Sequence, residues 1–269
     1  MSASYFARVS LVGVVLISVS LAALVLAISE GPDWGWEDRR VLAATAVAVL
    51  AGASFIRRCA RHPEPVVDLT LFRARSFTVA NAATVTYGMG FLAMLLGNVL
   101  FLTEIWHYST LRAGLAITPA PILVALLAGP AGRLATRVGY RPVIAAGSIV
   151  FALGMCWYAV TSGSHTGYLR IWLPGLLLVG VGIGLAFPVL GAAAASSLPP
   201  DRFAVGSAIN QTCRQVGAAL GVAILVALLS KNTAGPAAVA GFRHVWVYSA
   251  TMAALTGAIS LLLGRRNLA

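Results

Sequence analysis

Long apolar runs separated by short charged connections dominate this sequence and limit what it can fold into. Most of these runs approach the roughly twenty residues that a helix needs to cross about 30 Å of hydrocarbon. The runs cover approximately Val9–Ile28, Val41–Ile56, Ala80–Leu102, Ala113–Leu134, Val143–Val160, Ile171–Ala195, Val205–Leu229 and Val245–Leu263. We therefore expect an all-α, polytopic membrane protein with about eight transmembrane helices.

The amino-acid composition excludes a soluble protein with a single membrane anchor. Only 10% of the 269 residues are charged and 59% are hydrophobic, whereas a soluble domain usually carries about 25% charged residues. The net charge of +11 does not indicate nucleic-acid binding, because the basic residues lie in short loops rather than on a continuous basic face with interleaved aromatic residues. We expect the lipid bilayer as a partner and no nucleic acid.

The basic residues favour one set of alternate loops by about two to one, which predicts the orientation of the chain. One side of the membrane would hold Arg8, Arg57, Arg58, Arg61, Arg73, Arg75, Arg133, Arg137, Arg141, Arg202, Arg265 and Arg266. The other side would hold Arg39, Arg40, Arg112, Arg170, Lys231 and Arg243. Because cytoplasmic loops are enriched in Lys and Arg, we expect both termini in the cytoplasm.

Two connections between the apolar runs stand out. The acidic connection Gly31–Asp38 contains two tryptophans that suit the outer membrane interface. The stretch Arg57–Phe77 alternates leucine and phenylalanine with arginine near its end and predicts an amphipathic segment on the cytoplasmic surface. It divides the chain into two linker helices (1–58), an amphipathic linker (59–79) and a six-helix bundle (80–269).

The ionisable residues do not indicate catalysis or a metal site. No acidic residue lies in the middle of a predicted span, and Glu104 at the outer end of the third run comes nearest to one. The histidines are scattered, and no metal or redox spacing relates the three cysteines, Cys59, Cys156 and Cys213. We expect no enzyme activity, no metal and no cofactor.

A polar stripe on the third apolar run marks one face of that helix. At 100° per residue, its members fall within an arc of about 120°. They are Asn81, Thr84, Tyr87, Gly88 and Asn98. Such a stripe faces another helix or a water-filled cavity rather than lipid. Interhelical hydrogen bonding and substrate contact are therefore both open, and these residues are our substrate-cavity candidates.

A second stripe, on the seventh apolar run, combines polar and small residues within about 80°. Its members are Ser207, Asn210, Arg214, Gly217 and Gly221. The two glycines allow another helix to approach closely. Arg214 is the one strong base inside a predicted span, and no acid of this chain is an obvious partner, which indicates a partner from elsewhere. These residues are our candidates for close contact with another helix.

The short basic segment between the fourth and fifth runs carries the motif residues Gly132, Arg133, Arg137, Gly139, Arg141 and Pro142. It reads Gly-Arg-Leu-Ala-Thr-Arg-Val-Gly-Tyr-Arg-Pro and resembles the cytoplasmic loop motif of the major facilitator superfamily, Gly-x-Leu-Ala-Asp-Arg-x-Gly-Arg-Arg. Pro65–Arg73, followed by Ser76 and Phe77, resembles the linker before the ninth span of its fourteen-span drug:proton antiporters of the EmrB/QacA type. Ser207–Gly221 resembles their thirteenth span.

This resemblance covers nearly the whole chain and implies a function. The eight helices would correspond to the last eight of fourteen, so the amino-terminal bundle would be missing. The chain would then be the C-terminal part of a proton-coupled multidrug efflux antiporter of the plasma (inner) membrane, inactive without that bundle, driven by a proton gradient and selective for small amphipathic or cationic drug-like substrates. Thr136 stands where the loop motif often has Asp, so charge pairing at that position is not implied.

The same resemblance assigns places to the helices. Those at 80–102 and 171–195 would line a central cavity, and those at 113–134 and 205–229 would face the missing bundle, so the stripe on the seventh run would be part of the bundle interface. Two other functions stay open: a half-size transporter that acts as a homo-oligomer, and a membrane scaffold that does not transport.

Overall fold

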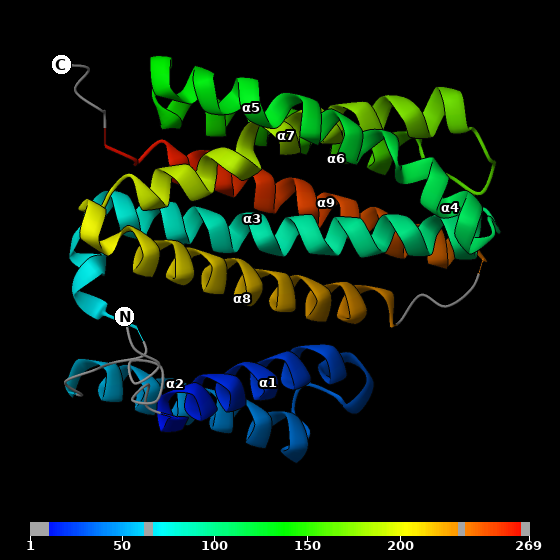
Figure 1. The fold of residues 1–269 in the computed structure, drawn as a ribbon. Coiled ribbons are helices and arrows are strands. Elements are labelled where there is room, and N and C mark those ends of the chain that lie inside the picture. Colours follow the sequence, from blue (N-terminus) through cyan, green and yellow to red (C-terminus); the bar gives the residue numbers. More distant parts are fainter. Residues whose placement is uncertain (1–10, 62–66, 231–234, 265–269) are drawn as a thin grey trace. The chain divides into compact units, whose positions relative to one another are not determined.

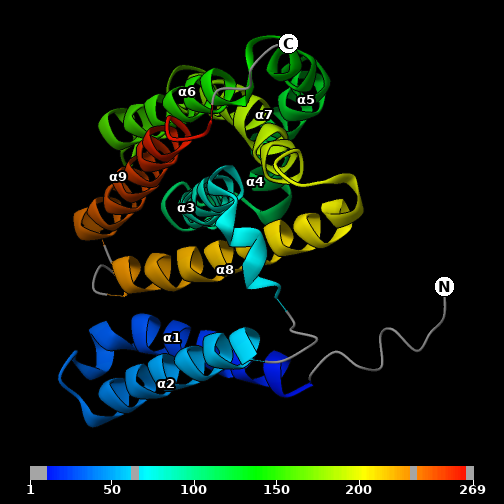
Figure 2. The ribbon, with the colours of Figure 1, turned by 90° about the vertical axis from the view of Figure 1, so that its left-hand side faces the viewer.

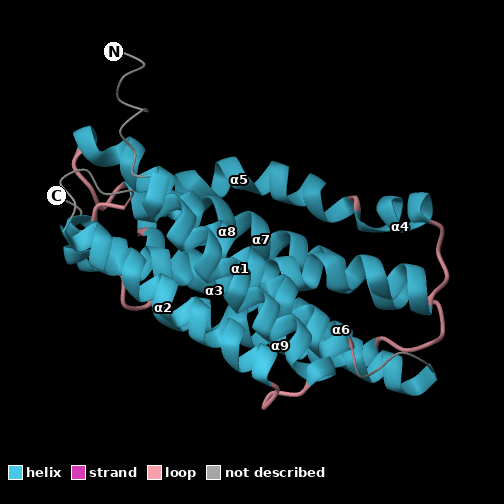
Figure 3. Cartoon of the chain, turned by 90° about the horizontal axis from the view of Figure 1, so that it is seen from below, coloured by secondary structure: helices cyan, strands magenta, loops and turns pink. Residues whose placement is uncertain are grey.

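The computed structural model describes residues 11–61, 67–230 and 235–264. Within these ranges every regular element is a helix, as Figure 3 shows, and the predicted all-α fold is confirmed. The chain forms two compact units, Met1–Arg73 and Ala74–Ala269. The division falls inside the stretch from which the sequence predicts an amphipathic linker.

The first unit is a helical hairpin of α1 (Leu11–Trp34) and α2 (Arg39–Arg61). Ala27, Val41 and Ala44 are buried together between the two helices. The Ser20 hydroxyl donates a hydrogen bond of 2.8 Å to the Ala48 carbonyl oxygen. Small side chains at these positions let the two helices approach closely, which is common in membrane helix pairs.

The connection between α1 and α2 is shorter than the sequence predicts. The helix α1 continues through Pro32 to Trp34, so Gly31–Asp38 is not a loop over its whole length. The turn starts at Gly35, whose φ of 93° favours glycine. The Arg40 guanidinium lies 5.4 Å from the centre of the Trp34 ring. This cation–π contact lies where α1 ends and α2 begins.

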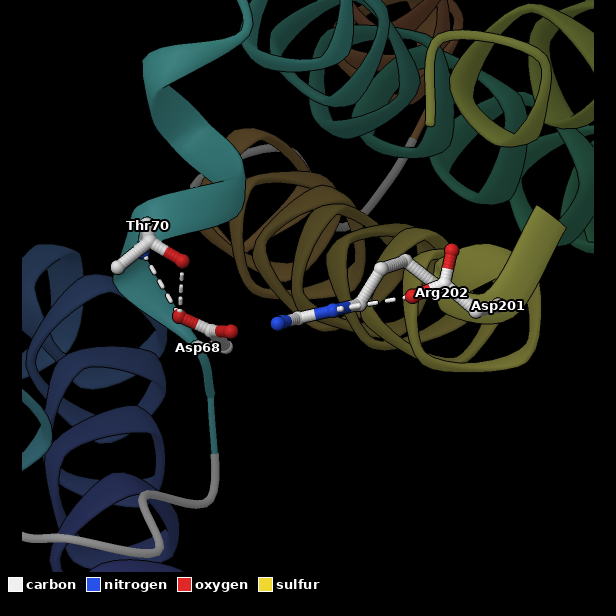
Figure 4. Close-up of polar contacts among 4 residues, drawn as sticks. All are labelled: Asp68, Thr70, Asp201 and Arg202. Carbon is white, nitrogen blue, oxygen red and sulfur yellow. Dashed lines mark hydrogen bonds and ion pairs between the residues drawn. The ribbon is translucent and has the colours of Figure 1, made fainter. Parts of the chain in front are cut away.

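The linker after α2 contains a short 3₁₀-helix, η2 (Leu69–Arg73). Asp68 precedes it, and its Oδ1 accepts hydrogen bonds from the amide (2.9 Å) and the hydroxyl (2.6 Å) of Thr70, as drawn in Figure 4. These bonds satisfy a backbone amide at the helix start that would otherwise lack an acceptor. The helix α2 extends to Arg61, beyond the end that the sequence predicts.

The second unit is a bundle of seven α-helices within the described residues. They are α3 (Arg75–Leu100), α4 (Thr110–Ile117), α5 (Pro119–Val138), α6 (Tyr140–Thr161), α7 (Leu173–Ala195), α8 (Phe203–Leu229) and α9 (Gly235–Ser260). One-turn π-helices, η3 (Phe101–Ile105) and η4 (Tyr168–Trp172), adjoin α3 and α7, and the 3₁₀-helix η5 (Pro200–Arg202) precedes α8.

The helix α3 lies in the middle of the second unit, packed against α7, α8 and α9. Figure 2 shows this bundle nearly end-on, with α6 beside both α7 and α9, and α5 on the outer side of α7. The arrangement encloses α3 and α7, whereas α5 and α8 each keep a largely exposed side.

Seven helical stretches among the described residues are long and apolar enough to cross a membrane. They are Val12–Trp34, Arg39–Arg61, Arg75–Ile105, Thr110–Val138, Tyr140–Thr161, Tyr168–Ala195 and Pro200–Leu229. The chain is therefore a multi-pass membrane protein. The helix α9 is also long, at 26 residues, but Arg243 and His244 lie within it and it is not among these seven.

Two further helix boundaries, both in the second unit, differ clearly from the sequence-based prediction. The fourth apolar run forms two helices, α4 and α5, joined at Thr118. Pro119 and Pro121 lack amide hydrogens and oppose a continuous helix, so the helix breaks before them. The last helix, α9, begins at Gly235 rather than near Val245. Its early polar residues lower the local hydropathy without interrupting the helix.

Basic residues gather at one end of the second unit. Arg75 begins α3, Arg137 is in the last turn of α5, and Arg202 directly precedes α8. The start of α3, the end of α5 and the start of α8 lie at the same end of the bundle, on the left in Figure 1. The Arg202 Nε also lies 3.8 Å from Asp201 Oδ2, an exposed contact drawn in Figure 4. This clustering agrees with the prediction that the arginine-rich loops lie on one side of the membrane.

Candidate functional site

The helices α3 and α8 pack very closely against each other, and three glycines allow this contact. A methyl group added at Gly217 would overlap the backbone carbonyl oxygen of Val85 on α3. One added at Gly221 would overlap the carbonyl oxygen of Met89 in the same way. From the other side, a methyl group at Gly88 would lie 2.9 Å from the Arg214 carbonyl oxygen. The two backbones therefore touch directly, as in other small-residue helix pairs.

A buried cluster of polar side chains lies on the same contact. The Asn210 amide on α8 donates to Asn81 Oδ1 (3.1 Å) and to Thr84 Oγ1 (2.9 Å) on α3. The Asn81 amide and the Thr84 hydroxyl in turn donate to backbone carbonyl oxygens of α3 one turn earlier, each over 2.9 Å. All three side chains are at most 3% exposed. These hydrogen bonds tie the two helices together at one register.

An aromatic cluster continues along α3 from this polar cluster. The ring of Tyr87 lies 6.4 Å from that of Phe91 and 5.9 Å from that of Phe187 on α7. The rings of Phe91 and Phe187 lie 5.4 Å apart, and both are partly exposed. The Tyr87 hydroxyl is buried and has no hydrogen-bond partner among the described residues. The cluster is thus buried at Tyr87 and partly accessible at Phe91 and Phe187.

Arg214 joins this aromatic cluster from α8. Its guanidinium carbon lies 4.3 Å from the centre of the Phe187 ring, a cation–π contact. Arg214 lies near the middle of α8, about 16 Å along the helix axis from Phe203 at 1.5 Å per residue. Gly191 on α7 leaves room beside it, because a methyl group there would lie 3.7 Å from Arg214 Nη2. A base at this depth of a membrane-spanning helix is costly and is usually functional.

The exposed side of α8 next to Arg214 is also polar. Ser207, Gln211 and Gln215 are exposed, and the helical period places them on the same side as half-buried Arg214. We call these four residues the polar face of α8. Two amides and a guanidinium at these positions are unfavourable toward lipid, so this face is expected to contact water, a ligand or another helix.

Asn98 lies apart from this site. Its Oδ1 accepts a hydrogen bond of 2.9 Å from the indole of Trp246 on α9. Trp246 belongs to a buried aromatic group at the opposite end of the bundle from the basic residues, where its ring lies 4.9 Å from that of Phe101 and 5.6 Å from that of Tyr158. Asn98 thus makes an interhelical hydrogen bond there.

The structure therefore separates the predicted candidates into groups. It brings Asn81 and Thr84 together with Asn210, and it places Tyr87 beside Phe187. A role of the α3 residues in substrate binding stays a prediction. Three of the five α8 candidates for contact with another bundle, Asn210, Gly217 and Gly221, instead face α3 of the same bundle. Of the other two, Ser207 is exposed and Arg214 is half-buried.

Four residues of this site are not among the site residues predicted from the sequence. They are Phe91, Phe187, Gln211 and Gln215. The glutamines carry a usable signal, because they recur at i and i+4 beside Arg214 within an apolar run. The phenylalanines carry little signal, since an apolar ring does not contrast with an apolar helix.

The basic loop motif is largely helical. Gly132, Arg133 and Arg137 belong to α5, Arg141 and Pro142 belong to α6, and Gly139 alone separates the two helices. Gly139 has a φ of 93° and a ψ of 159°, a conformation that is essentially restricted to glycine. The hydroxyl of Thr136 donates to the Arg133 carbonyl oxygen over 2.7 Å, so it bonds within its own helix.

Comparison with known proteins identifies the family. The sequence model of the Major Facilitator Superfamily matches residues 79–268, which contain nearly all of the second unit. The chain belongs to the Major Facilitator Superfamily. The predicted membership is thereby confirmed.

Individual members of the superfamily match a larger part of the chain. It is 31% identical over 223 residues to the multidrug resistance protein Stp of Mycobacterium tuberculosis strain H37Rv, over 83% of this chain and 41% of the relative. It is 28% identical over 222 residues to the tetracenomycin C resistance and export protein of Streptomyces glaucescens, over 82% and 40%. It is 27% identical over 219 residues to the multidrug export protein EmrB of Escherichia coli, over 81% and 42%.

These relatives, which are named as resistance and export proteins, confirm the predicted resemblance to drug exporters of this superfamily. The chain spans about two fifths of the length of the curated relatives it matches, as the covered shares of 40% to 42% show.

Proposed function

We propose that this chain forms the C-terminal part of a proton-coupled multidrug efflux antiporter and acts in transport rather than catalysis. The matched relatives are named as resistance and export proteins, and the superfamily match covers the second unit. The polar face of α8 carries the proposal, because it holds Arg214 and two glutamines on the exposed side of a helix that is apolar enough to span a membrane.

A second helix bundle would cover this face during transport. The polar face of α8 would then line a path between the two bundles, and rocking of one bundle against the other would open that path to alternate sides. The second bundle could belong to the same polypeptide, to another chain or to a second copy of this one. The proposed orientation puts both termini and the basic end of the second unit in the cytoplasm of an inner membrane, as the arginine distribution favours.

An efflux assay tests this function. Bacteria that lack their own exporters would express the chain alone, or the chain together with the amino-terminal portion of a relative such as Stp that this chain does not match. Accumulation of cationic ethidium and of anionic fluorescein would be measured with and without a protonophore. We expect lower accumulation only in the two-part case, and a return to the control level with the protonophore.

Each other outcome has a definite meaning. Export by the chain alone would contradict the need for a separate bundle and would favour the homo-oligomer. A two-part complex that copurifies but exports neither dye, with or without a proton gradient, would contradict the transport function. Export that persists in the presence of the protonophore would contradict proton coupling but not the transport function.

A further inference from the structure

The charge of Arg214 has no counter-charge in the part of the chain that the structure describes. No carboxylate there forms an ion pair with it, and its guanidinium rests on the Phe187 ring. In the same unit, Glu104 is exposed in η3 and Asp201 lies beside Arg202 before α8. These two acids lie at opposite ends of the bundle, whereas Arg214 lies near the middle of α8. Any opposite charge that pairs with Arg214 therefore comes from outside the described residues of the second unit.

The guanidinium also keeps its hydrogen-bond donors available. The guanidinium lies over the Phe187 ring, and a ring face accepts no N–H bond of ordinary strength. Arg214 makes no hydrogen bond to another described residue, although a guanidinium has five N–H donors in a fixed fork. That fork matches the two oxygens of a carboxylate or sulfonate. The glycine at position 191 leaves space on this side of α7.

The surroundings favour an aromatic partner over a simple anion. The partly exposed rings of Phe91 and Phe187 lie 5.4 Å apart, within the range in which aromatic groups stack or meet edge to face. A planar ring placed against them would hold an attached acid group near Arg214. Gln211 and Gln215 are exposed on the same side of α8 and could bond polar substituents.

We infer that Arg214 binds the anionic group of an aromatic substrate whose ring packs against Phe91 and Phe187. The transporter would thus favour aromatic carboxylates or sulfonates over cations of the same shape, because a cation near Arg214 is repelled and an anion is attracted. This inference rests on the proposed transport function. It keeps the amphipathic substrates that the family resemblance implies and replaces the cationic ones by aromatic anions.

Binding of three matched naphthalene compounds tests the inference. The full chain, in lipid nanodiscs, would be titrated with 2-naphthoate, neutral 2-naphthalenemethanol and (2-naphthylmethyl)trimethylammonium, with empty nanodiscs subtracted. We expect naphthoate to bind most tightly. Arg214→Gln should weaken naphthoate binding at least tenfold and should tighten binding of the cation, whereas Arg214→Lys should weaken naphthoate binding by less than Arg214→Gln does.

A matched control separates this effect from general loss of charge. Arg112 makes a similar cation–π contact, 4.0 Å from the Tyr108 ring, in a different part of the bundle. Arg112→Gln should leave naphthoate binding unchanged. Thermal unfolding of each variant would show that the bundle remains folded. Equal naphthoate affinity of the wild type and Arg214→Gln, or no naphthoate binding to the wild type, would overturn the inference.

The anion could also come from an acidic side chain of a second bundle. In that case naphthoate would bind the chain alone but not the copurified two-part complex, and the substrate assignment would be wrong. This outcome differs from failure of the proposed function, which appears as absence of efflux by the complex. Naphthoate binding that depends on Arg214 in both preparations supports the inference independently of the efflux result.

Discussion

Substitution of the glycines between α3 and α8 gives a direct test of the packing. In Gly217→Ala or Gly221→Ala, the new methyl group would overlap a backbone carbonyl oxygen of α3. A backbone atom cannot rotate away as a side chain can, so the helices must separate. Overpacking of this kind costs about 1–3 kcal/mol, and the better helix propensity of alanine returns at most about 1 kcal/mol. We expect each variant to lose about 1–2 kcal/mol of unfolding free energy.

Separation of the helices would add a second cost. Asn210 donates two hydrogen bonds to α3, and such bonds between membrane helices contribute on average about 0.6 kcal/mol each. A shift large enough to relieve the overlap at Gly217 would lengthen both bonds. The double variant Gly217→Ala/Gly221→Ala should therefore lose about 2–4 kcal/mol in total.

Gly129 on α5 provides the matched control, because a methyl group added there would have no atom within 4 Å. Gly129→Ala should leave the unfolding free energy unchanged or raise it by up to about 1 kcal/mol. Unfolding of the purified chain in mixed micelles would be followed by circular dichroism as SDS is added. If Gly217→Ala were as stable as Gly129→Ala, the close contact between α3 and α8 would be refuted.

Three further predictions concern other contacts of the second unit. A double-mutant cycle of Thr84→Ala and Asn210→Ala should give a coupling energy of about 0.6 kcal/mol in the same unfolding assay, and zero coupling would contradict their hydrogen bond. Gly139→Ala should cost about 1–3 kcal/mol of unfolding free energy because of its backbone conformation; an unchanged midpoint would argue against the turn. Trp246→Phe should cost about 1–3 kcal/mol of unfolding free energy, because it leaves the side-chain oxygen of Asn98 unpaired. Adding Asn98→Leu should restore part of the thermal stability, and no recovery would contradict that pairing.

Sequence periodicity was sufficient to predict which residues share a helix face, but not what that face contacts. It placed Asn81 and Thr84 on one face of α3, and the structure shows both bonded to one residue of α8. The face of α8 that carries Gly217 and Gly221 was expected to meet a missing bundle, yet it packs against α3. A helical projection contains no information about the partner, because that depends on how the other helices pack.

Hydropathy was a good guide to the existence of helices and a poor guide to their ends and irregularities. It predicted α7 closely but missed the break at Thr118 and the early start of α9 at Gly235. These features depend on missing amide hydrogens and on backbone bonding, and hydropathy measures neither. Phe187 was missed for a related reason, since its contact with Arg214 depends on the packing of α7 beside α8.

The two π-helical turns have a consequence for insertions and deletions in this family. Each wide turn accommodates one more residue than an α-turn, and each lies at the end of a helix. Loss of one residue from Phe101–Ile105 or Tyr168–Trp172, at the ends of α3 and α7, would shorten the π-turn to an α-turn and leave the faces of α3 and α7 unchanged. Loss of one residue from the middle of α3 would instead rotate everything beyond it by about 100°. Single-residue gaps between homologous genes are therefore expected at the π-turns and should be rare along α3.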